Sequence, residues 1–160
     1  MEWKNDLSLL EELIAVRSVS GDERPIRDFL LATIEREKKS WKVEPEIHFG
    51  DGFQDCIVLT FGAPKTAMYA HIDSIGYTVG YQNELIKVGG PKPIEDTLLV
   101  GSDSQGEIEV PLMVIEDEQG NHTLKAVSER TLDRGTCLSY KPDFRLEKNF
   151  LKSPYIDNRM

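Results

Sequence analysis

Residues 67–80, AMYAHIDSIGYTVG, determine how the rest of the sequence is interpreted. A run of small and apolar residues, typical of a buried strand, ends at His71, and Asp73 follows two residues later. Gly76 then gives the backbone freedom to turn away without crowding these side chains. We therefore predict that a strand ends here at a candidate site and that a different kind of fold follows it.

The residues before this stretch predict the first part of an α/β sheet domain. Apolar side chains recur at helical spacing over about residues 6–16, and again in a second helix that begins near Asp22. Pro25 fits the first turn of that helix, where its missing N–H does no harm. Three strand patterns follow, VEPEIHF, DCIVLTFG and TAMYAHID. This order of elements assigns residues 1–73 to an α/β sheet domain.

The residues after His71 have almost no helical periodicity and predict a separate β module. Short strand patterns alternate with Gly, Asn, Asp and Pro, which suits a small β-barrel or sandwich over about residues 74–151. The six patterns are SIGYTVGY, ELIKVGG, TLLVGSD, GEIEVPLMVIED, HTLKAVSE and CLSYKP. The predicted fold class is thus α/β: a partial α/β sheet domain interrupted by an inserted small β-barrel domain.

A chain that leaves a sheet domain for an inserted module is expected to return to it. Residues 152–160 are the predicted return into the α/β domain. Because two helices and three strands make an unfinished α/β domain, we expect that Met160 is not the natural end of the fold.

Composition excludes several classes of protein. The net charge of −9, from 19 basic and 28 acidic residues, argues against nucleic acid or an anionic membrane as the main partner. Cys56 and Cys137 lie far apart without a CxxC pairing, so neither a disulfide scaffold nor a thiolate zinc site is expected. The acidic, amphipathic start is unlike a signal peptide, and no apolar run reaches the ~20 residues of a membrane span. We expect a cytoplasmic protein.

The position of His71 and Asp73 at the end of a predicted strand makes them a candidate metal site. A catalytic metal needs a neutral imidazole held on a rigid element, and His71 ends a predicted buried strand, where open α/β sheets place their active sites. Asp73 has the same strand parity and is placed to bind or orient a ligand. Asp157, in the returning segment, is a candidate carboxylate that bridges two metal ions. The alternatives are that His71 only fills a strand end and that Asp157 is a helix N-cap.

Three segments resemble a known family in order and spacing: SVSGDERPIRDFL, MYAHIDSIGYTV and YIDNRM. They are similar to the glutamyl and deblocking aminopeptidases that build tetrahedral particles, in the zinc peptidase clan. The resemblance covers nearly the whole chain. It implies an α/β catalytic domain interrupted by a β-barrel, two divalent metal ions (Zn or Co) in the complete enzyme, peptide substrates and a homo-oligomer.

The resemblance also implies roles for individual residues. His71 matches the terminal ligand of one metal ion, Asp73 the acidic residue that supports this ligand, and Asp157 the carboxylate that bridges both ions. In the family a Glu-Glu pair follows that carboxylate and supplies the general base and a further ligand. A further Asp and a distant His complete the sites. None of these has a counterpart before Met160, so we expect the 160-residue chain alone to be inactive or nearly so.

Two other interpretations of the chain remain open. It is either a truncated homologue that acts as a binding or oligomer-assembly module without catalysis, or a part whose site is completed by a separate chain. A reading frame that continues beyond Met160 into a Glu-Glu pair would favour a fragment of an enzyme.

Overall fold

The computed structural model describes residues 3–147 and 150–153. The fold mixes helix and sheet, and most of its regular elements are strands. The helices are α1 (Trp3–Ala15) and α2 (Arg24–Glu37), with short 3-10 turns at η1 (Lys38–Ser40) and η2 (Tyr81–Asn83). The strands are β1 (Glu46–Gly50), β2 (Gln54–Thr60), β3 (Gly76–Val79), β4 (Leu85–Val88), β5 (Leu98–Asp103), β6 (Gly106–Glu116), β7 (His122–Ala126), β8 (Cys137–Tyr140), β9 (Arg145–Glu147) and β10 (Phe150–Lys152).

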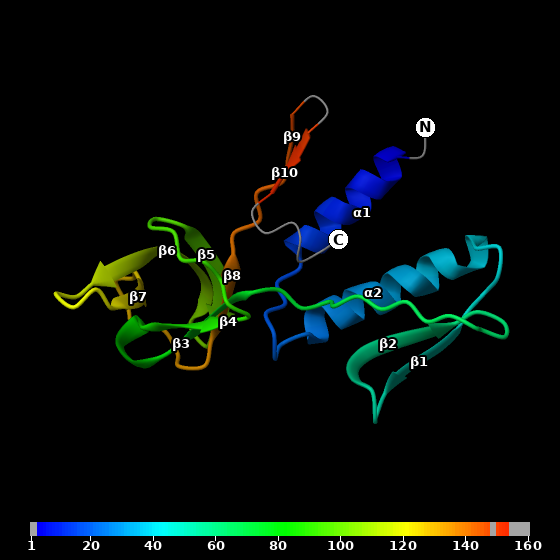
Figure 1. The fold of residues 1–160 in the computed structure, drawn as a ribbon, viewed down its shortest axis with the longest axis horizontal. Helices are drawn as coiled ribbons and strands as arrows, with labels where there is room; N and C mark the ends of the chain where they lie inside the picture. Colours follow the sequence, from blue (N-terminus) through cyan, green and yellow to red (C-terminus); the bar gives the residue numbers. More distant parts are fainter. Residues whose placement is uncertain (1–2, 148–149, 154–160) are drawn as a thin grey trace.

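The first part of the chain contains both predicted helices and two of its three predicted strands. Pro25 lies in the first turn of α2, as expected for a residue without an N–H to donate. Strands β1 and β2 form an antiparallel pair with Ile47 opposite Leu59. Helix α2 lies against β2, and it buries Ile26 and Thr33. Figure 1 shows this helix and hairpin beside each other, away from the larger sheet.

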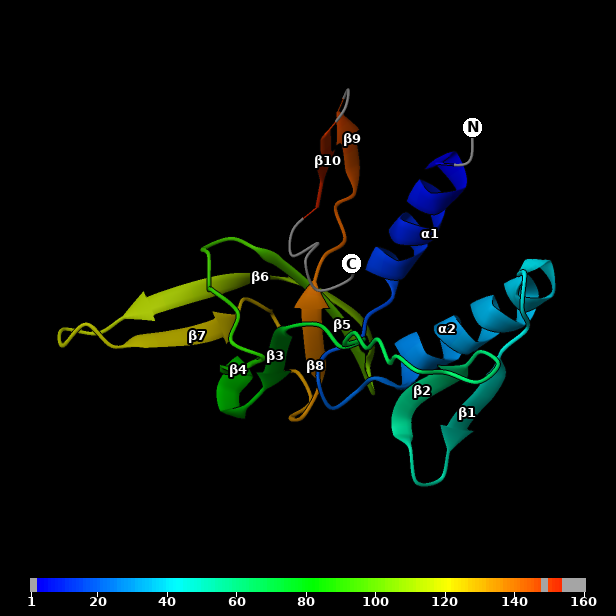
Figure 2. The same cartoon turned by 45° about the vertical axis from the view of Figure 1, so that its right-hand side comes forward.

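The third predicted strand, within residues 66–73, does not form. Residues 67–73 contain no strand, and the side chains of Met68 and Tyr69 are 95% and 97% exposed. A strand needs a neighbour that accepts and donates backbone hydrogen bonds, and among the described residues no strand pairs with residues 67–73. Figure 2 shows this segment running from β2 to β3. The prediction was wrong because the pattern of residues indicates only a propensity to form a strand, and not whether a neighbouring strand is there to pair with it.

All six strands predicted for the β module are confirmed. They form one antiparallel sheet in the order β4-β3-β8-β5-β6-β7. A bridge between Glu84 and Lys125 brings the two outer strands together, so the sheet is nearly closed into a barrel. Its interior is apolar, because alternate side chains of each strand point inward. The buried set comprises Tyr77, Val79, Leu85, Leu99, Ile108, Val110, Leu112, Leu124, Ala126, Leu132, Leu138 and Tyr140.

Two polar contacts help to fix the barrel. The hydroxyl groups of Tyr77 and Tyr140 lie 3.0 Å apart in a hydrogen bond, and their rings meet edge to face. Arg130 donates two hydrogen bonds, of 2.6 and 2.9 Å, to the carboxylate of Asp103, whose side chain is fully enclosed. These bonds lower the pKa of Asp103 to about 2, so this carboxylate is ionised at neutral pH.

The barrel ends earlier than the sequence pattern predicted. The six-stranded sheet spans Gly76–Tyr140, whereas β9 and β10 form a separate two-stranded sheet that ends at Lys152, one residue beyond the range of about 74–151 assigned to the barrel. Lys141 still donates a backbone hydrogen bond to Leu98, but Pro142 has no N–H with which to extend the ladder. No helix among residues 3–147 and 150–153 is long and apolar enough to cross a membrane.

Candidate functional site

The candidate site lies where the α1–α2 loop meets the segment that leads into the barrel. Ser74 donates a backbone hydrogen bond of 2.8 Å to Ser18, and Ser20 donates one of 3.1 Å back to Ser74. The Ser74 hydroxyl adds a bond of 2.9 Å to the carbonyl of Ser18. Val19 and Ser74 thus form a parallel bridge between segments that are far apart in the sequence. This bridge fixes the backbone immediately after the candidate residues.

His71, Asp73 and Ser20 form a chain of hydrogen bonds at this bridge. Nδ1 of His71 lies 3.2 Å from a carboxylate oxygen of Asp73 and 3.1 Å from its backbone carbonyl. Both neighbours accept hydrogen bonds, so Nδ1 is the nitrogen that donates in this arrangement, which in the neutral ring leaves the lone pair on Nε2. The Ser20 hydroxyl donates a short hydrogen bond to the other Asp73 carboxylate oxygen. The structure therefore brings together the predicted pair and adds a third residue.

The Ser20 hydrogen bond also favours the ionised form of Asp73. This bond and, to a smaller extent, the contact with His71 lower the pKa of Asp73, although partial burial opposes the shift. Asp73 therefore stays ionised to a lower pH than an ordinary aspartate. An ionised carboxylate on Nδ1 orients the imidazole and makes it a stronger donor toward a metal ion.

The exposed His71 fits the requirements of a metal ligand. Its side chain is 57% exposed, so it is not a histidine packed into a core. An imidazole oriented in this way suits zinc and similar divalent ions as a ligand. In the part of the chain that the structure describes, no three His, Cys, Asp or Glu side chains group closely enough to hold an ion. The described residues thus supply one ligand and its support, while Asp157 lies outside them.

Gly76 has a different role from the one predicted. It begins β3, where a Cβ atom would lie 2.5 Å from the backbone oxygen of Leu138 and 2.6 Å from Cγ2 of Val19. Both distances are far below ordinary contact, so only glycine lets the α1–α2 loop approach the barrel this closely. Gly76 therefore serves close packing instead of a turn.

Ser20 was not assigned a role from the sequence. It lies 53 residues from Asp73, and a lone serine in a loop is ordinary turn composition. The SVSG motif contains the residue, but only the tertiary bridge reveals its partner.

Comparison with models of protein families finds no family that matches this chain. Comparison with curated proteins likewise finds no match.

Proposed function

We propose that this chain supplies part of the metal centre of a dinuclear metal-dependent aminopeptidase, which removes N-terminal residues from peptides. The observation that carries the proposal is the hydrogen-bonded series Ser20–Asp73–His71, which leaves the Nε2 lone pair of an exposed imidazole for a ligand. In this proposal residues 1–73 and 152–160 belong to one α/β catalytic domain, which the β-barrel module interrupts. Asp157 would bridge the two ions.

The described residues would provide one metal ligand, His71, and hold it in place; none of them is proposed to contact the substrate. Ser20 holds the Asp73 carboxylate, Asp73 holds the Nδ1 proton of His71, and His71 presents Nε2 in a fixed direction. Divalent ions bound at such a centre supply Lewis acidity and lower the pKa of a bound water molecule. By the resemblance, the general base comes from a Glu-Glu pair that follows the bridging carboxylate in the family. The support of one ligand is therefore the function that this chain's described geometry serves best.

Replacing His71 by alanine is expected to abolish zinc binding by the 160-residue chain. Isothermal titration of the unaltered chain with Zn²⁺ should give a dissociation constant tighter than about 10 μM, or about 7 kcal/mol. Asp157→Ala should abolish binding too, because the two proposed ligands must converge. Asp73→Asn should weaken binding about tenfold, since it removes the charge that supports the imidazole.

The matched control for this titration is His48→Ala. His48 lies on β1, with Nε2 3.8 Å from Glu46, and should leave the zinc affinity unchanged. Binding that is absent from the unaltered chain, or that survives His71→Ala, would contradict the proposal. Circular dichroism of each variant shows whether its fold is intact.

Assembly with further copies of the chain is the second candidate function. Met68 and Tyr69 are almost fully exposed in a segment that forms no strand, although its pattern is that of a buried strand. Unpaired extended backbone with apolar side chains tends to associate with another chain. We infer that residues 66–72 mediate self-association into a homo-oligomer, whether or not the chain takes part in catalysis.

Replacing both Met68 and Tyr69 by serine is expected to shift the chain toward the monomer. Sedimentation equilibrium over a range of concentrations measures the association of the unaltered chain and of this double variant. Ile86→Ser removes another exposed apolar side chain, from β4, and should not change the association. A strictly monomeric unaltered chain, or a double variant that associates as strongly, would exclude this role.

A further inference from the structure

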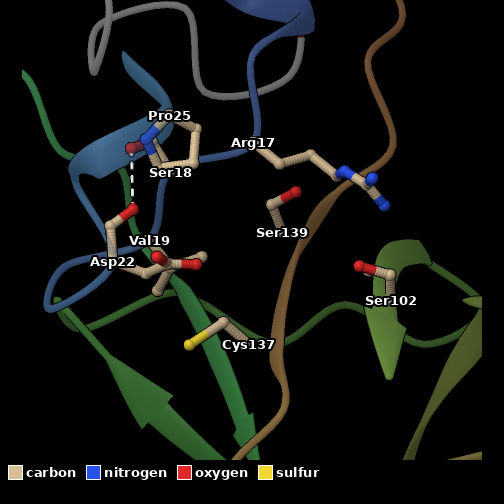
Figure 3. A pocket seen from close by; sticks show the side chains of 9 residues that line it. Arg17, Ser18, Val19, Asp22, Pro25, Ser102, Cys137 and Ser139 are labelled. Carbon is tan, nitrogen blue, oxygen red and sulfur yellow. Dashed lines mark hydrogen bonds between the residues drawn. The ribbon is translucent and has the colours of Figure 1, made fainter. Parts of the chain in front are cut away.

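A cavity of about 230 Å³ lies between the α1–α2 loop and strands β5 and β8. Arg17 and Asp22 line it from the loop, Ser102 from β5, and Cys137 and Ser139 from β8. Figure 3 shows the hydroxyl groups of Ser102 and Ser139 near the Arg17 side chain, with Asp22 on the opposite wall. None of these five residues belongs to the hydrogen-bonded series at His71, although Ser18 and Val19, which form the bridge to Ser74, line another part of the cavity.

Ser139 is the observation that points to a ligand. The residue is only 8% exposed, and within the described residues its hydroxyl oxygen has no hydrogen-bond partner. Buried hydroxyl groups are nearly always satisfied, because leaving one without a partner costs free energy. Ser139 lines the cavity, although its hydroxyl oxygen is itself almost completely covered. A small rotation of this side chain toward the cavity would give the hydroxyl a partner in a molecule bound there.

Arg17 supplies positive charge to the same space. Its guanidinium donates hydrogen bonds of 2.8 and 3.3 Å to the Glu107 carboxylate. These bonds use two of the five N–H groups of the side chain, so others remain for a second acceptor. Glu107 is 75% exposed, and exposed ion pairs of this kind are weak. The pair therefore positions Arg17 without preventing it from binding an anion.

The remaining walls limit which ligand fits. Burial, together with the nearby Asp22 carboxylate, raises the pKa of the Cys137 thiol, so this thiol stays neutral and does not repel an anion. Asp22 disfavours a second negative charge at its own end of the cavity. A ligand with one oxyanion group and a neutral or positive remainder satisfies both ends.

We infer that this cavity binds a small molecule through a phosphate or carboxylate group. Arg17 and the hydroxyl groups of Ser102 and Ser139 donate hydrogen bonds to the oxyanion, and Asp22 faces the other end of the molecule. A fork of N–H groups beside hydroxyl donors is well suited to either oxyanion. None of the residues that would hold the oxyanion belongs to the metal centre proposed above.

Titration of the ¹⁵N-labelled chain with inorganic phosphate and, separately, with acetate tests this inference by NMR. We expect saturable shifts at the amides of Arg17, Ser102 and Ser139 with at least one of the two ions. Saturation by phosphate alone assigns a phosphoryl ligand, and saturation by acetate alone assigns a carboxylate. Because the chain carries a net charge of −9, non-specific binding of anions elsewhere should be weak.

Variants separate the roles of the cavity residues. Arg17→Gln should weaken binding at least about tenfold, because it removes the charge-assisted bonds. Ser139→Ala should weaken it severalfold. Glu107→Gln should leave the affinity equal or higher, because it removes a competing carboxylate. Arg134→Gln, which alters an arginine beside Tyr81 on the barrel, should have no effect.

Two outcomes would overturn the inference: no saturable shift with either ion, or equal weakening by Arg17→Gln and Arg134→Gln. If Arg17→Gln does not fold, the other two variants test the inference. A site at the cavity predicts that Ser139→Ala weakens the binding of the ion while Glu107→Gln leaves it equal or stronger; the same affinity change in both would contradict the inference. His71→Ala should leave the phosphate titration unchanged, so failure of the metal proposal and failure of this one are distinguishable.

Discussion

Replacing Leu138 by alanine is expected to lower the free energy of unfolding by about 3–4 kcal/mol. Leu138 is 0% exposed on β8, between β3 and β5 in the sheet. Its Cδ2 atom lies where a Cβ on Gly101 would approach within 2.5 Å, so the side chain is closely packed. Truncation therefore removes buried apolar area and leaves a cavity in the centre of the barrel. Urea denaturation followed by circular dichroism measures the change.

Leu98→Ala is the matched control for this measurement. Leu98 lies on the neighbouring β5 but is 40% exposed, so its truncation should cost less than about 1 kcal/mol. Equal losses in the two variants would mean that the barrel interior does not determine stability. Both tryptophans, Trp3 and Trp41, precede the barrel in the sequence, so their fluorescence reports separately whether the first part unfolds with it.

The barrel strands were predictable because their sequence pattern is local. In β6, GEIEVPLMVIE, residues Ile108, Val110 and Leu112 alternate with exposed or partly exposed neighbours, and turn residues flank the strand. Such a pattern is enough to predict a strand when the apolar face of the sheet is buried within the same module. It does not show where a sheet stops: the predicted strand patterns end at CLSYKP, and β9 and β10 beyond them form a sheet of their own.

The segment at residues 66–73 shows the opposite case. Its residue types favour a strand, yet strand formation depends on a partner that no local pattern encodes. The predicted contact between His71 and Asp73 forms even though the strand does not. The two residues are only two positions apart, so their side chains can meet in an irregular segment as well.

The residues that sequence reasoning missed are those brought together by the fold. Ser20 reaches Asp73 only through the bridge between Val19 and Ser74. Arg17 and Ser139 likewise line one cavity from separate elements. Neither pair has a spacing that a motif could contain, so physical proximity became visible only in three dimensions.

Replacing Gly76 by alanine is expected to destabilise the chain by about 2–3 kcal/mol, through overpacking against backbone. The new Cβ would lie 2.5 Å from the carbonyl oxygen of Leu138, an atom held in the pairing of β3 with β8. Val19 is the other close neighbour, at 2.6 Å, and its displacement would loosen the bridge to Ser74. We therefore expect both a lower urea midpoint and weaker Zn²⁺ binding.

Gly80→Ala is the appropriate comparison, because Gly80 follows directly on β3 and has an ordinary backbone conformation. Its added Cβ would lie 3.3 Å from the carbonyl oxygen of Glu84, a contact that a small adjustment relieves. Gly80→Ala should therefore cost less than about 1 kcal/mol and leave zinc affinity unchanged. If Gly76→Ala were as mild, the close approach of loop and barrel would not hold Ser20 against Asp73. If it destabilised the fold but left zinc affinity intact, the ligand's orientation would depend on residues 71–73 alone.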